Sequence, residues 1–306
     1  MSALTRAREL LDVRAVPAAT RAAYDSDWRQ FAAWCGDAGR DPLPSTDEVV
    51  SLYLVHCAEV SRLKVATIQR RAWAISWQHK RAGHPSPVGA RVWVTLQAIA
   101  RAYGSEQRRV KALSIADVTG MVASLDLTRA AGLRDRALLL LGFSTGLRCS
   151  SLCSLLVSDV EFVSRGLLVH LRREKQDQEG RGRTIAVLRG EGGVADVVAA
   201  VCDWLAVEPG RVRLFGVSSR WVRQVVKDGC VRVGLDAREY SSHSLRAGMI
   251  TALDEAGVSL PNIMQRSGHK SPEVAARYVR VRESFSLDPF GQAGLGLVLR
   301  RANAAD

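Results

Sequence analysis

Two arginines, two histidines and a tyrosine in the second half of the sequence have the chemistry needed to break and rejoin a phosphodiester. In chain order they are Arg148, His243, Arg246, His269 and Tyr278. Two guanidinium groups can neutralise the oxygens of a phosphate in its transition state, and imidazoles can move protons near neutral pH. A tyrosine hydroxyl can attack phosphorus and form a covalent phosphotyrosine. Together these side chains predict phosphoryl transfer that needs neither a metal ion nor ATP.

The local sequence indicates how each of these side chains is presented. Arg148 follows a Thr-Gly-Leu stretch where one helix ends and another begins, and a helix N-terminus favours an anion. His243 and Arg246 are three residues apart and therefore share one face of a helix. His269 follows a helix end, and Tyr278 lies in a further helix after a Ser-Pro pair. Each pattern alone also fits an exposed arginine, a capping histidine or a half-buried tyrosine, so the prediction depends on the complete set.

The region that carries this chemistry is predicted to be helical with a small sheet. Two β-like runs, 167–171 and 184–188, flank the very polar segment 172–183 and predict a hairpin with a long tip, to which 160–163 could add a third strand. The predicted helices open at Ser114, cover 133–143, follow Gly146, and then cover 194–207, 218–233, 243–256, 261–267 and 272–280.

The first hundred residues predict a separate, wholly helical module. Apolar residues recur at helical spacing in four segments, over about 20–39, 45–58, 64–81 and 86–104. Ser45 and Glu48 predict a capping box at the start of the second helix, and Ser86 followed by a proline predicts the start of the fourth. The polar segment 105–111 has no periodicity and predicts a linker. We therefore expect two domains, residues 1–108 and 109–306.

Positive charge is concentrated in the helical module. The chain carries 43 Lys and Arg against 31 Asp and Glu, a net charge of +12, yet residues 1–59 are net −3 and residues 60–110 are net +9. This concentration favours a polyanionic partner, DNA or RNA, over a solvated helix face of mixed charge. The basic residues that we expect to contact DNA are Lys64, Arg70, Arg71, Lys80, Arg81, Arg108 and Arg109. Trp73, Trp77 and Trp93 lie among them, and we expect core packing rather than stacking on bases.

The composition excludes several classes of protein. At 47% hydrophobic and 24% charged residues it is typical of a globular chain, and no apolar stretch approaches the roughly 20 residues of a membrane span. The N-terminus lacks the apolar core of a secretory signal, so we expect a cytoplasmic protein. Six cysteines without a Cys-x-x-Cys pair indicate neither a disulfide scaffold nor a zinc ribbon, and we expect them to be reduced and mostly buried.

The ordered set of motifs resembles the tyrosine recombinases, the phage-integrase family, and within it the Cre-like recombinases. The likeness is closest from His243 to Val279 and extends over nearly the whole chain. It implies that Lys175, in the polar segment of the predicted hairpin, is a catalytic lysine that protonates the leaving 5′ oxygen. The catalytic set implied by the resemblance is therefore Arg148, Lys175, His243, Arg246, His269 and Tyr278.

The resemblance also implies an architecture and a mechanism. Residues 1–108 are expected to form an all-α core-binding domain of the SAM-like type, and residues 109–306 an α+β catalytic domain, which together clamp duplex DNA. Tyr278 is expected to form a 3′-phosphotyrosine, and a homotetramer on two DNA sites is expected to make and resolve a Holliday junction. The apolar tail over residues 287–306 is expected to dock on a neighbouring subunit, or alternatively on its own domain. No cofactor or metal is implied, and we expect a nucleoid-associated protein of a mobile genetic element.

One departure and two alternatives stay open at this point. The family often carries an acidic residue where this chain has Ser151. We therefore expect either a slower reaction or another residue in place of that acid. The sequence does not assign this role to Asp159. A type IB topoisomerase uses the same phosphotyrosine chemistry without a target sequence, but the separate helical module and the apolar tail argue against it. A non-enzymatic DNA-binding protein of the same fold is the other alternative, against which the complete catalytic set argues.

Overall fold

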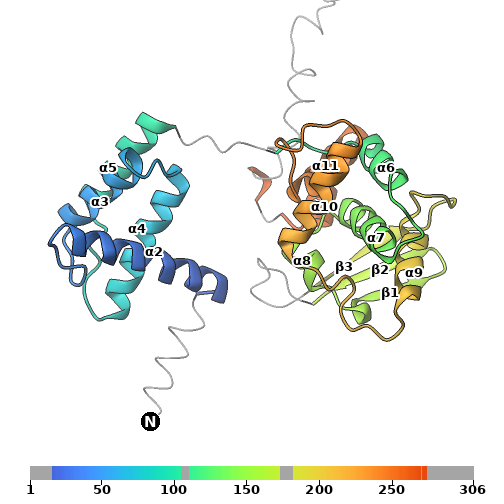
Figure 1. Ribbon diagram of the computed structural model, residues 1–306, viewed down its shortest axis with the longest axis horizontal. Helices are drawn as coiled ribbons and strands as arrows, with labels where there is room; N and C mark the ends of the chain where they lie inside the picture. Colours follow the sequence, from blue (N-terminus) through green and yellow to red (C-terminus); the bar gives the residue numbers. More distant parts are fainter. Residues whose placement is uncertain (1–15, 105–109, 173–181, 270, 274–306) are drawn as a thin grey trace, which may run out of the picture. The chain divides into compact units, whose positions relative to one another are not determined.

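The chain divides into two compact units, residues 1–108 and 109–306 (Figure 1). The computed structural model describes residues 16–104, 110–172, 182–269 and 271–273. Each unit has a hydrophobic core of its own. Within these ranges, no helix combines the length and the apolar composition that crossing a bilayer requires.

The first unit is helical throughout its described residues. Its elements are α2 (Ala18–Asp37), α3 (Asp47–Glu59), α4 (Val65–Arg81) and α5 (Ala90–Tyr103). Contacts join α2 to α4 and α3 to α5, and the fully buried side chains of Phe31, Tyr53, Leu54, Ile68 and Ile75 fill the space between them. The predicted helical module is thereby confirmed.

Two predicted helix starts in this unit are wrong by a few residues. Thr46, not Ser45, caps α3, because the Thr46 hydroxyl accepts a hydrogen bond from the main-chain N–H of Val49 at 3.3 Å. The last helix, α5, begins after Gly89 rather than at Ser86, whose hydroxyl instead accepts a hydrogen bond within the preceding turn. Hydroxyl residues stabilise turns as well as helix starts, so sequence alone does not separate the two.

The second unit combines helices with a small antiparallel sheet, as predicted. Its elements are α6 (Ile115–Ala123), α7 (Ala130–Thr145), α8 (Cys149–Ser154), η1 (Val157–Asp159), β1 (Val160–Val163), β2 (Gly166–Leu171), β3 (Arg183–Leu188), α9 (Val197–Val207), α10 (Ser219–Arg232), α11 (His243–Glu255) and α12 (Leu260–Ser267). The strands are ordered β1-β2-β3, and Leu167 lies opposite Val187 in the second pair. Helix α6 begins after Ser114, as predicted, and Ser114 and Asp117 form a capping box there.

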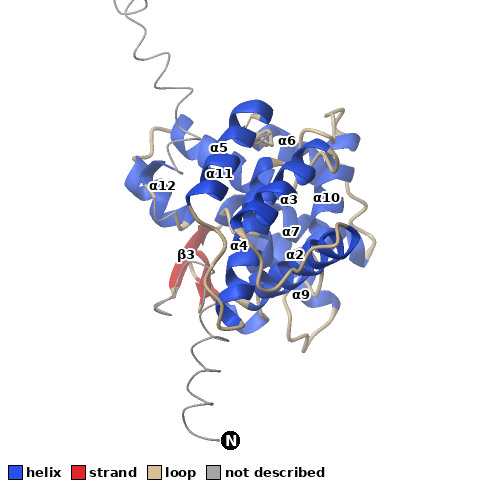
Figure 2. Ribbon diagram, turned by 90° about the vertical axis from the view of Figure 1, so that its left-hand side faces the viewer, coloured by secondary structure: helices blue, strands red, loops and turns tan. Residues whose placement is uncertain are grey.

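Helix α7 is the buried centre of this unit. It contacts α6, α8, α9, α10, α11 and β3, and residues 137–142 are buried on every side of the helix. Figure 1 shows α7 between α9 on one side and α10 and α11 on the other. Arg136 joins α7 to α9 and to the loop before it, because its guanidinium pairs with Asp203 at 2.8 Å and donates to the carbonyl of Val194 at 2.8 Å. Strand β3 lies on the side of the unit where α12 is found (Figure 2).

The cysteines are less buried than expected. Cys35, Cys57 and Cys230 are buried, whereas Cys149 and Cys153 are partly exposed and Cys202 is exposed, all six as free thiols. Half of the cysteines are therefore buried, where we expected most of them to be.

Gly248 on α11 is predicted to be intolerant of a side chain. A Cβ atom at this position would lie 2.1 Å from the carbonyl oxygen of Leu113 and 2.7 Å from the ring of Phe143. Replacing a helical glycine by alanine normally stabilises a helix, but here we expect Gly248→Ala to lower the free energy of unfolding by about 1–3 kcal/mol, because a main-chain atom must move. Thermal unfolding followed by circular dichroism measures the effect.

Gly36 on α2 is the control, because a Cβ atom there meets no heavy atom within 4 Å. We expect Gly36→Ala to leave stability unchanged or to raise it by up to about 1 kcal/mol. A Gly248→Ala variant as stable as wild type would contradict the close approach between α11 and Leu113.

Candidate active site

The turn between α7 and α8 presents Arg148. Gly146 ends α7 in the left-handed conformation, with φ of 58°, and a Cβ atom there would lie 2.0 Å from the terminal methyl of Met249. Backbone conformation and packing therefore both favour glycine at this position. Two residues later, Arg148 is the half-buried N-cap residue of α8. The Thr-Gly-Leu-Arg stretch thus forms the helix-to-helix turn that the sequence predicts.

The first turn of α11 carries His243 and Arg246. Arg246 is buried, with 4% of its surface exposed, and its Nη1 donates to the carbonyl oxygen of Gly146 at 2.7 Å. This hydrogen bond joins the helix of the second arginine to the turn of the first. The two arginines, 98 positions apart in the sequence, therefore belong to one site.

His269 reaches the same place from the end of α12. Gly268 ends that helix in the left-handed conformation, with φ of 70°, and turns the chain so that His269 faces Arg246. Nη2 of Arg246 lies 3.0 Å from Nε2 of the His269 ring, and the Ser267 hydroxyl lies 2.8 Å from its Nδ1. The ring is thus held from both nitrogens, which leaves it little rotational freedom.

The electrostatics of this site suit an anion. Burial and the guanidinium charges of Arg246, Arg148 and Arg183 lower the pKa of His269 to about 4. Partial desolvation, Arg246 and Arg148 also lower the pKa of His243. Both imidazoles are therefore neutral at pH 7 and able to accept or donate single protons, while the arginines keep their charge. An excess of positive charge beside neutral proton carriers is what a phosphate diester needs on its way to a pentacoordinate state.

Three further residues at this site are ones the sequence analysis did not select. Ser267 orients His269, and Arg223 on α10 adds to the positive potential that lowers the pKa of His243. Arg183, at the start of β3, donates to the carbonyl oxygen of Gln265 at 2.9 Å and so joins the base of the hairpin to the end of α12. Arg183 and Arg223 act on residues of other elements, so no local sequence signal marks them. Ser267 could have been found from its position two residues before His269.

Two members of the expected catalytic set, Lys175 and Tyr278, lie outside the described residues. Strands β2 and β3 pair as far as Leu171 and Arg183, the described positions on either side of the segment that contains Lys175. Because Arg183 also bonds to the end of α12, the base of this hairpin adjoins the turn that carries His269. The roles of Lys175 and Tyr278 stay predictions.

Ser151 and Asp159 have different surroundings. Ser151 is partly exposed on α8, and its carbonyl accepts a hydrogen bond from the Ser154 hydroxyl at 2.9 Å. Asp159 is buried, accepts a hydrogen bond from the main-chain N–H of Leu156 at 2.9 Å and pairs with Arg172 at 3.0 Å. Its carboxylate therefore stabilises the turn before β1 and the end of β2, and it does not replace an acid at position 151.

The expected DNA-contact residues of the first unit do not form one uniform group. Lys64, Lys80 and Arg81 are exposed, and Arg108 and Arg109 lie outside the described residues. Arg70 is exposed but bonds to Asp27 through two nitrogens, at 2.8 and 3.1 Å. These positions stay predictions as DNA contacts.

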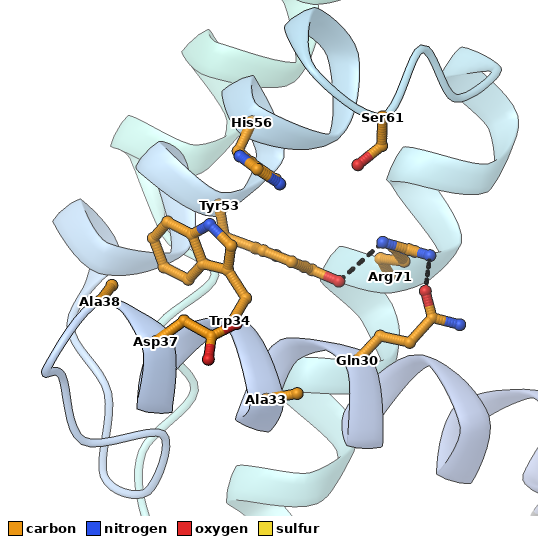
Figure 3. A pocket seen from close by; sticks show the side chains of 9 residues that line it. All are labelled: Gln30, Ala33, Trp34, Asp37, Ala38, Tyr53, His56, Ser61 and Arg71. Carbon is orange, nitrogen blue, oxygen red and sulfur yellow. Dashed lines mark hydrogen bonds between the residues drawn. The ribbon is translucent and has the colours of Figure 1, made fainter.

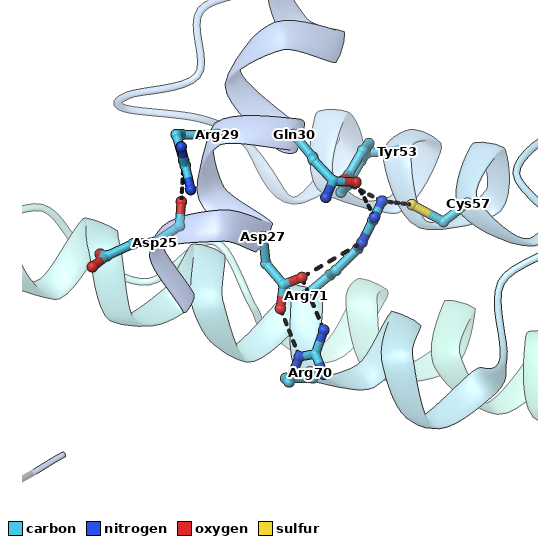
Figure 4. A network of polar contacts seen from close by, with 8 residues as sticks. All are labelled: Asp25, Asp27, Arg29, Gln30, Tyr53, Cys57, Arg70 and Arg71. Atoms are coloured by element: carbon cyan, nitrogen blue, oxygen red, sulfur yellow. Dashed lines mark hydrogen bonds and ion pairs between the residues drawn. The ribbon is translucent and has the colours of Figure 1, made fainter. Parts of the chain in front are cut away.

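For Arg71 the expectation is wrong, because its side chain is only 10% exposed. Its guanidinium donates to the Tyr53 hydroxyl at 2.8 Å, to the Cys57 sulfur at 3.3 Å and to the Gln30 side chain, and it lies 3.8 Å from Asp27 (Figure 4). Arg71 therefore joins α2, α3 and α4 inside the unit.

A surface cavity of about 500 Å³ opens beside Arg71. The side chains of Trp34, Tyr53 and His56 line one side of it, and Gln30 and Arg71 bond to each other at another (Figure 3). Because the donors that Arg71 presents here are bonded to Tyr53 and Gln30, this cavity is part of the structural network rather than a second phosphate site.

Two of the three tryptophans in the basic region are exposed. Trp73 and Trp93 have 45% and 44% of their surface exposed, and their rings meet nearly edge to face with centroids 5.4 Å apart. Our expectation of core packing is therefore wrong for this pair. Trp77 is partly buried, against Tyr24 and beneath the Arg81 guanidinium.

Comparisons with known proteins show what this chain is similar to. The sequence model of the Phage integrase family matches residues 113–284, more than half of the chain. The chain is 29% identical to "Integrase/recombinase xerD homolog" of Selenomonas ruminantium over 85% of its length and 81% of the relative's. It is 26% identical to "Recombinase cre" of Escherichia phage P1, over 84% and 82% of the two chains.

Solved structures share the fold at lower sequence identity. The XerH site-specific recombinase in a post-cleavage complex with its difH substrate superimposes with a TM-score of 0.63 at 14% identity, over 84% of this chain and 76% of that one. A lambda integrase dimer bound to a COC′ core site gives a TM-score of 0.61 at 19% identity, over 90% and 93%.

The lowered pKa of His269 predicts a pH dependence of stability. Because the ring is harder to protonate in the folded chain than in the unfolded chain, the unfolded state takes up the proton first as the pH falls below about 6.5. We expect the free energy of unfolding to fall between pH 6.5 and about 4, and to fall less in a His269→Asn variant. Thermal unfolding at intervals from pH 7.5 to 4.5 measures this. Parallel curves for the two proteins would contradict the electrostatic account of the site.

The network around Arg71 predicts that Asp27 is needed for stability. Asp27 is buried, with 3% exposed, and lies between Arg70 and Arg71. We expect Asp27→Asn to destabilise the first unit by about 3 kcal/mol, because it leaves the buried guanidinium of Arg71 without its neighbouring charge. Asp25→Asn on the same helix is the matched control, since Asp25 is exposed, and should change stability by less than about 0.5 kcal/mol. Urea denaturation of both variants tests the difference; equal midpoints would rule out this role.

Proposed function

The chain belongs to the phage integrase family, the tyrosine recombinases, and on this premise we propose how its own side chains cleave and rejoin DNA. It is a site-specific recombinase, an enzyme that exchanges DNA strands at defined sites. The observation that carries the proposed mechanism is the convergence of Arg246, His269 and the turn before Arg148 at one electropositive site.

In the proposed cleavage step, the Tyr278 oxygen attacks the scissile phosphorus. A bond forms between that oxygen and phosphorus, and the bond from phosphorus to the 5′ oxygen breaks, which leaves a 3′-phosphotyrosine. His243 accepts the tyrosine proton, for which its lowered pKa keeps the ring neutral. Lys175 donates a proton to the leaving 5′ oxygen. No metal ion takes part in this scheme.

The charge that develops on the phosphate is held by the residues around Arg246. Arg148 and Arg246 contact its non-bridging oxygens, and His269 donates a hydrogen bond from Nε2. In the structure this nitrogen faces Arg246 at 3.0 Å, so a bound phosphate oxygen can take both groups as donors. Without DNA, Nη2 of Arg246 donates to Nε2 of the neutral ring. Donation from Nε2 to the phosphate requires the tautomer that carries its proton there, and in that tautomer the Ser267 hydroxyl donates to Nδ1.

Strand exchange follows when a free 5′ hydroxyl from a second site attacks the phosphotyrosine. One such exchange makes a Holliday junction, and a second resolves it. We propose that a homotetramer on two duplex DNA sites carries out the reaction, and that exposed basic residues of the first unit, such as Lys64, Lys80 and Arg81, contact the DNA. The tail over residues 287–306 lies outside the described residues, and its docking on a neighbouring subunit stays part of this proposal. We place the enzyme in the cytoplasm with the DNA on which it acts.

The two alternative functions are not favoured. Relatives that align with most of this chain are named as recombinases and integrases, not as topoisomerases. Arg148, His243, Arg246 and His269 are all present, which argues against a protein that keeps the fold and has lost the chemistry.

Covalent capture of DNA tests the proposal. The full chain is incubated with sheared genomic DNA in EDTA, the reaction is stopped with SDS, and the protein-linked DNA ends are sequenced. We expect wild type to capture ends at a recurrent sequence, because a phosphotyrosine survives SDS and its formation needs no metal. Tyr278→Phe, which lacks the attacking oxygen, is expected to capture none.

Other outcomes lead to different conclusions. Captured ends scattered over unrelated sequences favour a topoisomerase-like activity. Equal capture by wild type and Tyr278→Phe would exclude Tyr278 as the nucleophile.

A further inference from the structure

Arg266, in the last turn of α12, donates hydrogen bonds to two other elements of the second unit, residues 109–306. Its Nε and Nη2 donate to the carbonyl oxygen of Ser144, at 3.1 and 2.7 Å, and its Nη1 donates to the carbonyl oxygen of Ala186, at 3.1 Å. Ser144 lies in the last turn of α7, and Ala186 lies in the edge strand β3. One side chain therefore joins α12, α7 and β3.

The two acceptors are main-chain groups that helix and sheet geometry leave available. The last carbonyl groups of a helix have no partner within the helix, and they lie at the negative end of its dipole, where a cation is favourable. Edge strands likewise direct carbonyl groups away from the sheet. Because the acceptors belong to the main chain, these bonds fix the position of the two segments themselves and not only of a side chain.

Packing alone does not hold these segments together. A cavity of about 310 Å³ lies between β3, α11 and α12, and Ile185, Asn262 and Gln265 are among the residues that line it. Arg266 borders this cavity and reaches β3 beside it. Burial and the charge of Arg183 lower the pKa of Arg266, so the guanidinium is costly to place here and its hydrogen bonds must compensate. A partly buried charge that joins incompletely packed elements has a positional role.

Each segment that Arg266 contacts leads directly to a residue of the proposed catalytic set. Ser144 is followed within the same turn by Arg148, and the intervening Gly146 accepts the hydrogen bond of Arg246. Arg266 itself is followed, after Ser267 and Gly268, by His269. Strand β3 is the described strand that follows the segment containing Lys175.

We propose that Arg266 is a positioning residue that holds the turn before Arg148, the turn before His269 and strand β3 at the mutual distances that DNA cleavage requires. This inference rests on the catalytic roles proposed above. Arg266 acts through these segments and does not itself touch the phosphate. Lysine cannot replace it, because a single ammonium group lacks the planar fork that donates to Ser144 and Ala186 together.

The first experiment separates DNA binding from cleavage in Arg266→Met and Arg266→Lys. Both are compared with wild type on the recurrent DNA site recovered by covalent capture, using the dissociation constant and the single-turnover rate of covalent complex formation at saturating protein. We expect binding to stay within about threefold of wild type and cleavage to slow by about 10- to 100-fold in both variants. Arg238→Met is the matched control, because the Arg238 side chain is 84% exposed, and its cleavage rate should equal that of wild type.

The second experiment is hydrogen exchange on the full chain without DNA, which does not depend on catalysis. We expect both Arg266 variants to lose protection in residues 142–149, 184–188 and 263–269, while α6 and α9 keep theirs. Because this measurement needs no reaction, it tests the positioning role of Arg266 even if wild type captures no DNA and the proposed function fails.

Three results would overturn the inference. Cleavage by Arg266→Met at the wild-type rate would show that the contacts are dispensable. Full activity of Arg266→Lys would show that charge alone suffices. Exchange that rises uniformly across residues 110–269, with cleavage lost only in proportion to the unfolded fraction, would show a general effect on stability.

Discussion

The buried end of α7 is the constraint on which the catalytic unit depends. Helix α7 lies in the middle of this unit, so the carbonyl groups of its last turn cannot all be hydrated and need donors from the protein. Arg266 from α12 donates to Ser144, and Arg246 from α11 donates to Gly146. Satisfying one helix end thereby brings together the three segments that carry Arg148, Arg246 and His269. The same hydrogen bonds therefore stabilise the fold and assemble the site.

The hydrogen-bond partners of Arg246 and Arg266 also affect the charge of the site. Guanidinium groups that bond to main-chain carbonyls keep their full positive charge, whereas a carboxylate partner would neutralise it. Arg246 and Arg266 donate to main-chain carbonyl oxygens, and Arg246 also contacts the His269 imidazole. This arrangement keeps the site electropositive and the rings of His243 and His269 neutral. In the proposed mechanism, a site built in this way is prepared for a phosphate before DNA binds, which avoids reorganisation during the reaction.

The first unit uses arginine differently. Arg70 and Arg71 are adjacent in the sequence, yet Arg70 is exposed beside Asp27 and Arg71 is buried among α2, α3 and α4. The net charge of the segment is therefore larger than the charge it can present to DNA. Trp73 and Trp93, by contrast, add an exposed aromatic pair to this surface. Within a basic segment, burial decides which residues can meet a partner.

The helical class, the small antiparallel sheet and the order of the proposed catalytic residues are predictable from the sequence, because they depend on local periodicity and on motifs read in series. The predicted helix start at Ser114 is correct. The predicted start of α3 is wrong by one residue, since neighbouring hydroxyl residues are equivalent as caps until the chain is folded. The folded chain is needed to see that Arg71 is internal and that Arg266 joins α7 to β3. The partners of Arg266 are carbonyl groups 122 and 80 positions away. Because every residue has a main-chain carbonyl group, the residue types at these positions do not indicate that they accept hydrogen bonds from Arg266.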